Sequence, residues 1–293
     1  PMDRKSFIKS FSLLTFVPTA MKLQAILNYT DNKIQPEALP VLFIGHGSPM
    51  NAIEENEFVN GWRKIAHRLH DVKAVLCVSA HWETAGTYIT GMDKPKTIHD
   101  FGGFPQELFD VQYPAPGDPL LANEIQSKFK EHIKIDHNWG LDHGCWSVLK
   151  QFFPNANVPV LQLSLDYNKD PGYHYELAKS LSELRKRGIL IIGSGNMVHN
   201  LSKLNWAHPE NGFDWAIEAN TTFKTLIDNR SHHELTNYVK LGKAIQLAVP
   251  TPEHFLPLLY VLAMQDQDED LQFFNDATVM GSISMTSVAI GLN

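Results

Sequence analysis

Three short apolar segments, each followed closely by Gly or Ser and then by a histidine, constrain the fold of this chain most strongly. Residues 40–44, 74–78 and 189–192 are rich in Val, Ile and Leu, as expected for parallel strands that are covered on both faces. Helical patterns separate these segments along the chain. We therefore predict an α/β fold with a single domain, a mostly parallel central sheet and helices on both faces.

The rest of the sequence fits this alternation. Four further segments have helical patterns, at residues 52–70, 118–132, 173–187 and 213–228. Two more strands are predicted, at residues 158–165 and 279–290. Because we find no linker and no internal repeat, residues 40–293 are predicted to form one catalytic domain.

Residues 1–39 are predicted to be an N-terminal extension. Basic residues, a short apolar run and small residues follow one another in this segment, and that order resembles a weak export signal. A helix packed against the domain is the favoured interpretation.

The composition excludes several classes of function. A formal net charge of −7 gives no basic surface for nucleic acid. Two cysteines, Cys77 and Cys145, are too few for a disulfide framework or a thiolate metal cluster. No apolar stretch approaches the ~20 residues that span a bilayer. We therefore expect a cytoplasmic protein with neither nucleic acid nor membrane as a partner, and export by the N-terminal segment is the alternative.

Four histidines are predicted to meet at one place in this fold. His46, His81 and His199 come shortly after the three predicted strands, and ligands of open α/β sheets bind beyond the carboxyl ends of the strands. Residues 251–254 have the threonine cap and the proline of a helix start, which places His254 in a first helical turn. No pair has the i, i+4 spacing of a helical zinc motif. We therefore predict a metal site that is assembled by the fold.

The alternative for each of these four histidines is a structural or surface role, because a single histidine is more often a surface group than a ligand. Eight further histidines lie in polar stretches and are predicted to be on the surface: His67, His70, His132, His137, His174, His208, His232 and His233.

Two segments rich in glycine and aromatic residues are predicted to be functional loops. Residues 91–117 contain too much Pro and Gly for regular structure, and long loops of this kind tend to carry function. We predict that this loop covers a substrate, with His99, Phe101, Phe104 and Tyr113 in its wall; packing of the aromatic residues on the core is the alternative. The second loop, residues 138–146, carries His143 between glycine and tryptophan residues that could stack on a planar ligand.

Six motifs together resemble the class III extradiol ring-cleavage dioxygenases, specifically the 4,5-DOPA extradiol dioxygenase branch. The resemblance covers residues 40–290, and the order of the six motifs makes it specific. They are Gly-His-Gly-Ser-Pro-Met at 45–50, Ser-Ala-His-Trp at 79–82, Thr-Ile-His-Asp-Phe-Gly-Gly-Phe-Pro at 97–105, Asp-His-Gly at 142–144, Gly-Asn-Met-Val-His-Asn-Leu at 195–201 and Thr-Pro-Glu-His-Phe-Leu-Pro-Leu at 251–258.

The resemblance implies a mononuclear non-haem iron(II) that cleaves a catechol, L-DOPA or a relative, with O₂. It also implies that a purified sample can hold zinc(II). It carries metal association over to His46, His81, His199 and His254. Related enzymes complete the iron site with a glutamate, so Glu253 is the alternative to His254 as a ligand.

The same resemblance leaves the role of His199 divided between a ligand and an acid/base group. Ring cleavage needs proton transfer, a task suited to histidine. His143 and His199 are the first candidates for this work, and His99 is the third.

Three other functions compete with this interpretation. A zinc hydrolase could use the same histidine cluster, with Glu253 or Asp142 as its base. A thiol enzyme could use Cys145 with His143, although adjacent residues rarely face each other productively. A metal-binding module without catalysis is the third. The natural catechol, the position of cleavage and the oligomeric state are left open by the sequence.

Overall fold

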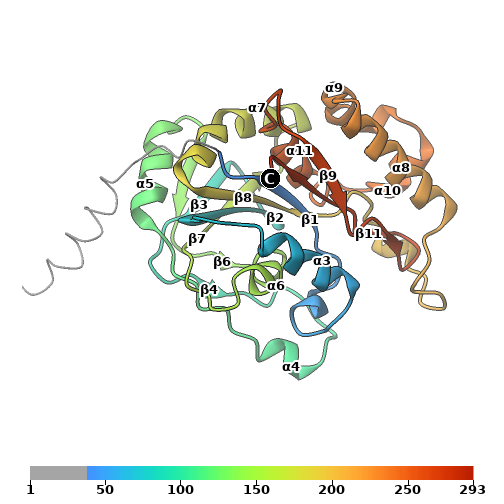
Figure 1. Ribbon diagram of the computed structural model, residues 1–293, viewed down its shortest axis with the longest axis horizontal. Helices are drawn as coiled ribbons and strands as arrows, with labels where there is room; N and C mark the ends of the chain where they lie inside the picture. The colour runs from blue at the N-terminus through green and yellow to red at the C-terminus, as the bar shows by residue number, and fades with distance from the viewer. Residues whose placement is uncertain (1–37, 293) are drawn as a thin grey trace, which may run out of the picture. The chain divides into compact units, whose positions relative to one another are not determined.

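The computed structural model describes residues 38–292, and its centre is a sheet of eight strands (Figure 1). Their order is β5 (Ile133–Asp136), β3 (Thr87–Thr90), β7 (Val160–Asp166), β2 (Ala74–Thr84), β8 (Ile189–Gly195), β1 (Val41–Gly45), β12 (Ser287–Ile290) and β9 (Leu271–Phe274). The central strands β7, β2, β8 and β1 pair in parallel. The antiparallel pairs lie toward the two edges, at β3 with β7, β1 with β12 and β12 with β9. The predicted mostly parallel sheet is confirmed.

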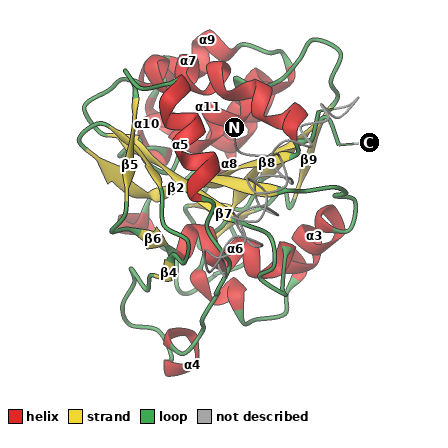
Figure 2. Cartoon of the chain, turned by 90° about the vertical axis from the view of Figure 1, so that its left-hand side faces the viewer, coloured by secondary structure: helices red, strands yellow, loops and turns green. Residues whose placement is uncertain are grey.

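Helices cover both faces of this sheet (Figure 2). One face packs against α5 (Pro119–Lys128), α7 (Pro171–Leu181), α8 (Asp214–Asp228), α10 (Lys243–Ala248) and α11 (Leu256–Leu262). The other face packs against α3 (Glu57–Ala66) and α6 (His143–Phe152). Successive residues of β1 enter opposite cores, with Phe43 on the first side and Leu42 and Ile44 on the second, as the two-residue period of a strand requires. This explains why the central strands are continuously apolar.

Short elements complete the described chain. Two additional helices are α4 (Gln106–Phe109) and α9 (His232–Thr236). Four 3-10 helices are η1 (Pro49–Ala52), η2 (Ser182–Arg187), η3 (Leu201–Lys203) and η4 (Tyr238–Lys240). Two small ladders pair β4 (Lys96–Thr97) with β6 (Gly140–Leu141) and β10 (Thr278–Val279) with β11 (Ile283–Ser284). None of the described helices is long and apolar enough to cross a membrane. The expected extension lies, up to residue 37, outside the described residues.

Strand β2 runs further than its apolar segment predicts. Its register with β7 shifts between Val78 and Glu83, and pairing resumes there as far as Thr84. His81 therefore lies within the strand rather than beyond its end. The bulge explains the difference, because it interrupts the apolar pattern while the backbone stays extended.

Two helix boundaries at the site also differ from the prediction. Helix α11 begins at Leu256, so His254 lies in the preceding turn and not in a first helical turn. The Thr251 hydroxyl donates to the Glu253 carboxylate instead of capping a helix. Conversely, His143 is the first residue of α6 rather than part of a loop, because the Asp142 carboxylate accepts the Cys145 N–H and caps the helix.

Other boundaries were misplaced by local backbone geometry. The helix expected at residues 52–70 begins only at Glu57, where the Asn56 side chain caps it. The single late strand is broken into β10, β11 and β12, and Met280 and Gly281 in the break both have positive φ. Strands β3 and β5, at one side of the sheet, were not predicted, because they are short and lack a long apolar run.

Candidate active site

Histidines from separate parts of the chain meet near the carboxyl ends of β1, β2 and β8. The ring centroids of His46, His81 and His254 form a nearly equilateral triangle, with separations of 5.1 Å, 5.0 Å and 5.4 Å. His46 and His254 are buried, at 2% and 7% exposure. The His46 N–H donates to the Gly195 carbonyl at the end of β8, which fixes the turn that follows β1. Three segments distant in the sequence therefore present imidazoles to one point.

Each of these three rings has its Nδ1 beside an oxygen atom. His46 Nδ1 donates to Ser194 Oγ at 3.0 Å, because the Ser194 hydroxyl is itself spent on the Gly144 carbonyl. His254 Nδ1 donates to the Glu253 carboxylate at 3.1 Å, and His81 Nδ1 lies 3.4 Å from Asp100 Oδ2. Metal-binding histidines commonly donate one ring N–H to such a partner, which leaves the other nitrogen free to coordinate.

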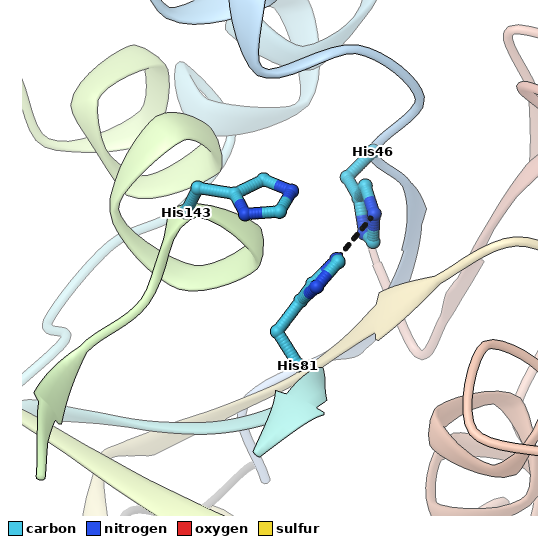
Figure 3. Close-up of side chains that lie close together, drawn as sticks. All are labelled: His46, His81 and His143. Carbon is cyan, nitrogen blue, oxygen red and sulfur yellow. Dashed lines mark hydrogen bonds between the residues drawn. The ribbon is translucent and has the colours of Figure 1, made fainter. Parts of the chain in front are cut away.

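The Nε2 atoms left over have no satisfactory partner within the described chain. His46 Nε2 and His81 Nε2 face each other at 3.2 Å (Figure 3), and both carry a lone pair when both Nδ1 atoms are protonated. His254 Nε2 is buried and makes no hydrogen bond in the described structure. Since buried polar atoms are normally paired, these residues fit a cation that the three nitrogens share.

Two more histidines flank the triangle. The His143 ring lies 3.8 Å from that of His81 and 5.8 Å from that of His46, and Figure 3 shows the three side chains pointing toward one another. The His199 ring stacks on His254 with a centroid distance of 3.4 Å. Possible ligand atoms lie within 4.8 Å of one another in two adjoining groups, His46 with His81 and His143, and His199 with Glu253 and His254.

Burial keeps the clustered imidazoles neutral. It lowers the pKa of His46 and His254 well below the usual histidine range, and the neighbouring rings lower it further. Burial lowers the pKa of His81 to about 3 and that of His199 to about 4. Because only the neutral ring can coordinate a metal, the cluster is ready to bind at neutral pH without first losing protons.

A buried carboxylate anchors the start of α6. Asp142 accepts hydrogen bonds from the Ser79 hydroxyl at 2.7 Å and from Gln162 Nε2 at 2.7 Å, besides capping the helix. Burial raises its pKa. The adjoining Cys145 is fully buried, and burial raises the pKa of its thiol well above the usual value. A thiolate nucleophile needs the opposite environment, so the structure argues against the thiol-enzyme alternative.

The predicted substrate loop is divided between the site and the core. Phe101 contacts the His143 ring edge-on at 5.5 Å, and Phe104 packs against Phe101 at 5.4 Å. By contrast, Tyr113 is 1% exposed and donates to the Phe153 carbonyl. His99 Nε2 bonds to the Val111 carbonyl, within the loop itself. We therefore place Phe101 and Phe104 beside the site, while Tyr113 and His99 hold the loop together.

One histidine predicted to lie on the surface is fully buried. His174 is 0% exposed, and its two ring nitrogens pair with the Tyr260 hydroxyl at 3.1 Å and the Asp166 carbonyl at 3.3 Å. The signal was present, because His174 shares a helical face of α7 with Leu177, Ala178 and Leu181. Sequence reasoning also missed Asp100 and Ser194, whose contacts with the cluster form only in the folded chain.

Comparison with known proteins agrees with this geometry. Residues 40–291 match the family of the catalytic LigB subunit of aromatic ring-opening dioxygenase. The chain belongs to this family. The resemblance noted in the sequence is thereby confirmed, and the protein is a ring-cleaving dioxygenase of the extradiol type.

Similar proteins cover most of the chain. A 4,5-DOPA dioxygenase extradiol from Escherichia coli K12 is 43% identical, over 86% of this chain and 95% of its own length. One from Beta vulgaris is 36% identical, over 84% and 94%. The crystal structure of an uncharacterized protein from Escherichia coli K12 superposes with a TM-score of 0.74 at 37% identity, over 86% of this chain and 100% of that chain. The predicted fold class is confirmed.

Proposed function

We propose that this LigB-family enzyme cleaves the ring of a catechol, L-DOPA or a close relative, with O₂ at one iron(II) ion per chain. The observation that carries the proposal is the close approach of the His46, His81 and His254 rings, each of which has its Nδ1 beside an oxygen atom. Relatives named 4,5-DOPA dioxygenase extradiol support the substrate class.

His46, His81 and His254 are the proposed ligands. Glu253, the alternative to His254, uses its carboxylate to hold His254 Nδ1, so its role in this site is to orient the ligand. The two groups of possible ligands adjoin, because the His46 and His254 rings lie 5.4 Å apart, and one shared ion satisfies both. Zinc(II) fits the same nitrogen ligands, and we expect it in part of a purified sample.

When bound, the ion brings the catechol and O₂ together and allows electrons to pass between them. Three protein ligands leave positions open for this purpose, whereas four or five tight ligands would not. His143 and His199 are therefore proposed to stand beside the ion and to act on protons. Both lie within reach of the triangle, with ring centroids 3.8 Å from His81 and 3.4 Å from His254, respectively.

A catechol also needs an apolar surface for its ring. Phe101 and Phe104 lie next to His143 and pack against each other edge-on. An aromatic substrate can contact this pair in the same manner, since edge-to-face packing is favourable between rings. The wall formed by Phe101 and Phe104 is therefore the proposed substrate-binding surface.

A zinc hydrolase fits the geometry less well. Such an enzyme needs a carboxylate free to act as a general base. Glu253 is bonded to His254 and Thr251, and Asp142 is fully buried with three hydrogen-bond donors of its own. Neither carboxylate is free.

Two buried cysteines without a disulfide fit the cytoplasm, which is the proposed location.

Metal-free protein loaded with iron(II) under anaerobic conditions and then mixed with L-DOPA in air tests the proposal. We expect O₂ uptake and a coloured ring-opened product. His81→Ala should abolish both, and the exposed His70→Ala serves as the matched control. The absence of O₂ uptake across a panel of catechols, with iron bound, would exclude the proposed reaction.

A further inference from the structure

Asp100 lies at the centre of a set of contacts that the proposed reaction does not yet use. Its Oδ2 lies 2.9 Å from His143 Nδ1 and 3.4 Å from His81 Nδ1, both within ion-pair distance, although His143 Nδ1 makes no hydrogen bond within the described residues. Its Oδ1 accepts the backbone N–H of His143 at 2.9 Å. Within residues 38–292 no lysine or arginine forms an ion pair with it. One carboxylate thus faces two imidazoles and the first turn of α6, although it belongs to an irregular loop.

The chemistry of a carboxylate dictates which ring nitrogens carry protons. An ionised carboxylate can only accept hydrogen bonds, so its negative charge favours the tautomer with N–H toward Asp100 at each imidazole nitrogen that faces it. His143 is then protonated on Nδ1, and its Nε2 carries the free lone pair. Which nitrogen of a histidine is available depends on the hydrogen bond that the other nitrogen makes.

The position of Asp100 in the chain gives this contact a second consequence. The next residue, Phe101, meets the His143 ring edge-on at 5.5 Å. Consecutive residues therefore hold His143 at its Nδ1 and against its ring. Gly102 and Gly103 follow, both exposed, and a Cβ at either would touch nothing. Asp100 and Phe101 are thus the residues of this loop that contact His143, and the two glycines after them are not packed against other residues.

We propose that Asp100 is a positioning residue that holds His143 with Nε2 toward the reacting ring and aligns His81 for the metal ion. The inference rests on the proposed function, because it assigns Asp100 a part in that reaction. The shorter distance to His143 makes this ring the principal partner. Removing a residue that orients a histidine in this way typically lowers metal affinity or activity by about 10–100-fold.

Asp100→Asn separates this role from simple packing. The amide has the same shape as the carboxylate, but it offers one acceptor oxygen in place of two. It cannot serve the His143 N–H, His143 Nδ1 and His81 Nδ1 together. An amide NH₂ opposite His143 Nδ1 forces the ring proton onto Nε2, the nitrogen that the reaction needs free.

A double-mutant cycle measures whether Asp100 acts through His143. At saturating iron(II), Asp100→Asn should lower kcat by about 10–100-fold and leave KM for the catechol nearly unchanged. In the His143→Gln background the same substitution should cause little further loss in kcat, because the principal partner is gone and saturating iron(II) compensates for a weaker alignment of His81. Losses in kcat that multiply, or a kcat equal to that of the wild type, would overturn the inference. Asp110→Asn, at an exposed position hydrogen-bonded to the Gln106 side chain in the same loop, is the matched control.

The histidine tautomer provides a readout that does not depend on turnover. Two-bond ¹H–¹⁵N correlation spectra of ¹⁵N-histidine-labelled, zinc-loaded protein distinguish Nδ1–H from Nε2–H, and the His143 signals are those missing from His143→Gln. We expect Nδ1–H in the wild type and in Asp110→Asn, and a shift toward Nε2–H in Asp100→Asn. The same tautomer in all three proteins would contradict the proposal.

The outcomes also separate this inference from the proposed function. If His81→Ala and His143→Gln retain full O₂ uptake, the proposed site itself is wrong. If both lose it while Asp100→Asn keeps its turnover and its tautomer, the site stands and only the role of Asp100 is rejected.

Discussion

The two ends of the central strands treat buried polar groups in opposite ways. At the amino ends of β1 and β8, Arg185 is 1% exposed, and each of its three guanidinium nitrogens donates a hydrogen bond. It donates to the Leu39 carbonyl at 2.7 Å, to the Met264 carbonyl at 2.6 Å and to both carboxylate oxygens of Glu269. At the carboxyl ends of the same strands, the Nε2 atom of the buried His254 makes no hydrogen bond within residues 38–292.

This difference separates a stabilising group from a functional one. A buried charge is tolerated only when its hydrogen-bond partners are supplied, and the Arg185 end supplies them from within the chain. At the histidine cluster, the partner of the buried His254 Nε2 would have to come from a ligand. His174 makes the same point for a single residue type, because it is as buried as His254 but has both ring nitrogens paired.

The largest effect is expected from His254→Phe. This substitution tests whether the histidine cluster at the carboxyl ends of the strands serves function and not stability. Phenylalanine keeps a ring beside His199 but removes the ligand atom, so O₂ uptake should fall to the background of the assay. The metal-free protein should keep its unfolding free energy within about 1 kcal/mol, because removing the unpaired buried Nε2 offsets the loss of the hydrogen bond between Nδ1 and Glu253. Metal content, O₂ uptake and urea unfolding measure the two parts. A folded variant that retains turnover would break the comparison.

Arg185→Met tests in the same way whether the buried ion pair at the amino ends of the strands serves stability and not function. Removing the cation leaves two carbonyl groups without this donor and the Glu269 carboxylate without its opposite charge, a loss of about 3–5 kcal/mol in unfolding free energy. The folded fraction should retain the kcat of the wild type. If Arg185→Met does not fold, the milder Glu269→Gln should still lower the urea midpoint with unchanged kcat. A loss of kcat without a loss of stability, in either variant, would contradict the assignment.

The paired histidine predicts a pH dependence of stability. Burial lowers the pKa of His174 to about 4, whereas an unfolded chain titrates near ~6.5. Between these values the unfolded chain binds a proton that the folded chain does not, so stability falls as the pH drops through this window. The full shift corresponds to about 3 kcal/mol. Urea unfolding of the metal-free protein measures this. Between these two pKa values the unfolding free energy of His174→Gln should fall by about this amount less than that of the wild type, and an equal fall in both proteins would refute the role of His174.

The smallest effect is expected at the wall formed by Phe101 and Phe104, beside the histidine cluster. Phe104→Leu removes one edge-to-face partner, worth about 0.5–1.5 kcal/mol, so KM for the catechol should rise by about 2–10-fold. Metal content and kcat should stay unchanged. Phe129→Leu, at a partly buried position in the core next to α5, is the control. If KM is the same in both variants, the wall does not contact the substrate.

Local sequence patterns predicted those parts of the structure that local forces decide. The apolar runs of β1, β2 and β8 identified the parallel core, and the residues that follow them identified His46, His81 and His199. The bulge in β2 and the true start of α11 were missed, since pairing with β7 and the turn at 251–255 depend on neighbouring segments. The helix at His143 was missed because glycine and tryptophan suggested a loop, while the Asp142 cap went unrecognised.

The sequence by itself determined the fold class, the family and the identity of the histidines that gather at one edge of the sheet. Only the tertiary structure decided how these histidines differ from one another. The orientation and tautomer of the rings depend on Ser194, Glu253 and Asp100. Ser194 and Asp100 lie far in the sequence from the histidines that they contact, His46 and His81, and Glu253 is adjacent to His254. Hydrogen bonds act over about 3 Å, so they can assign roles only after folding has brought these side chains together.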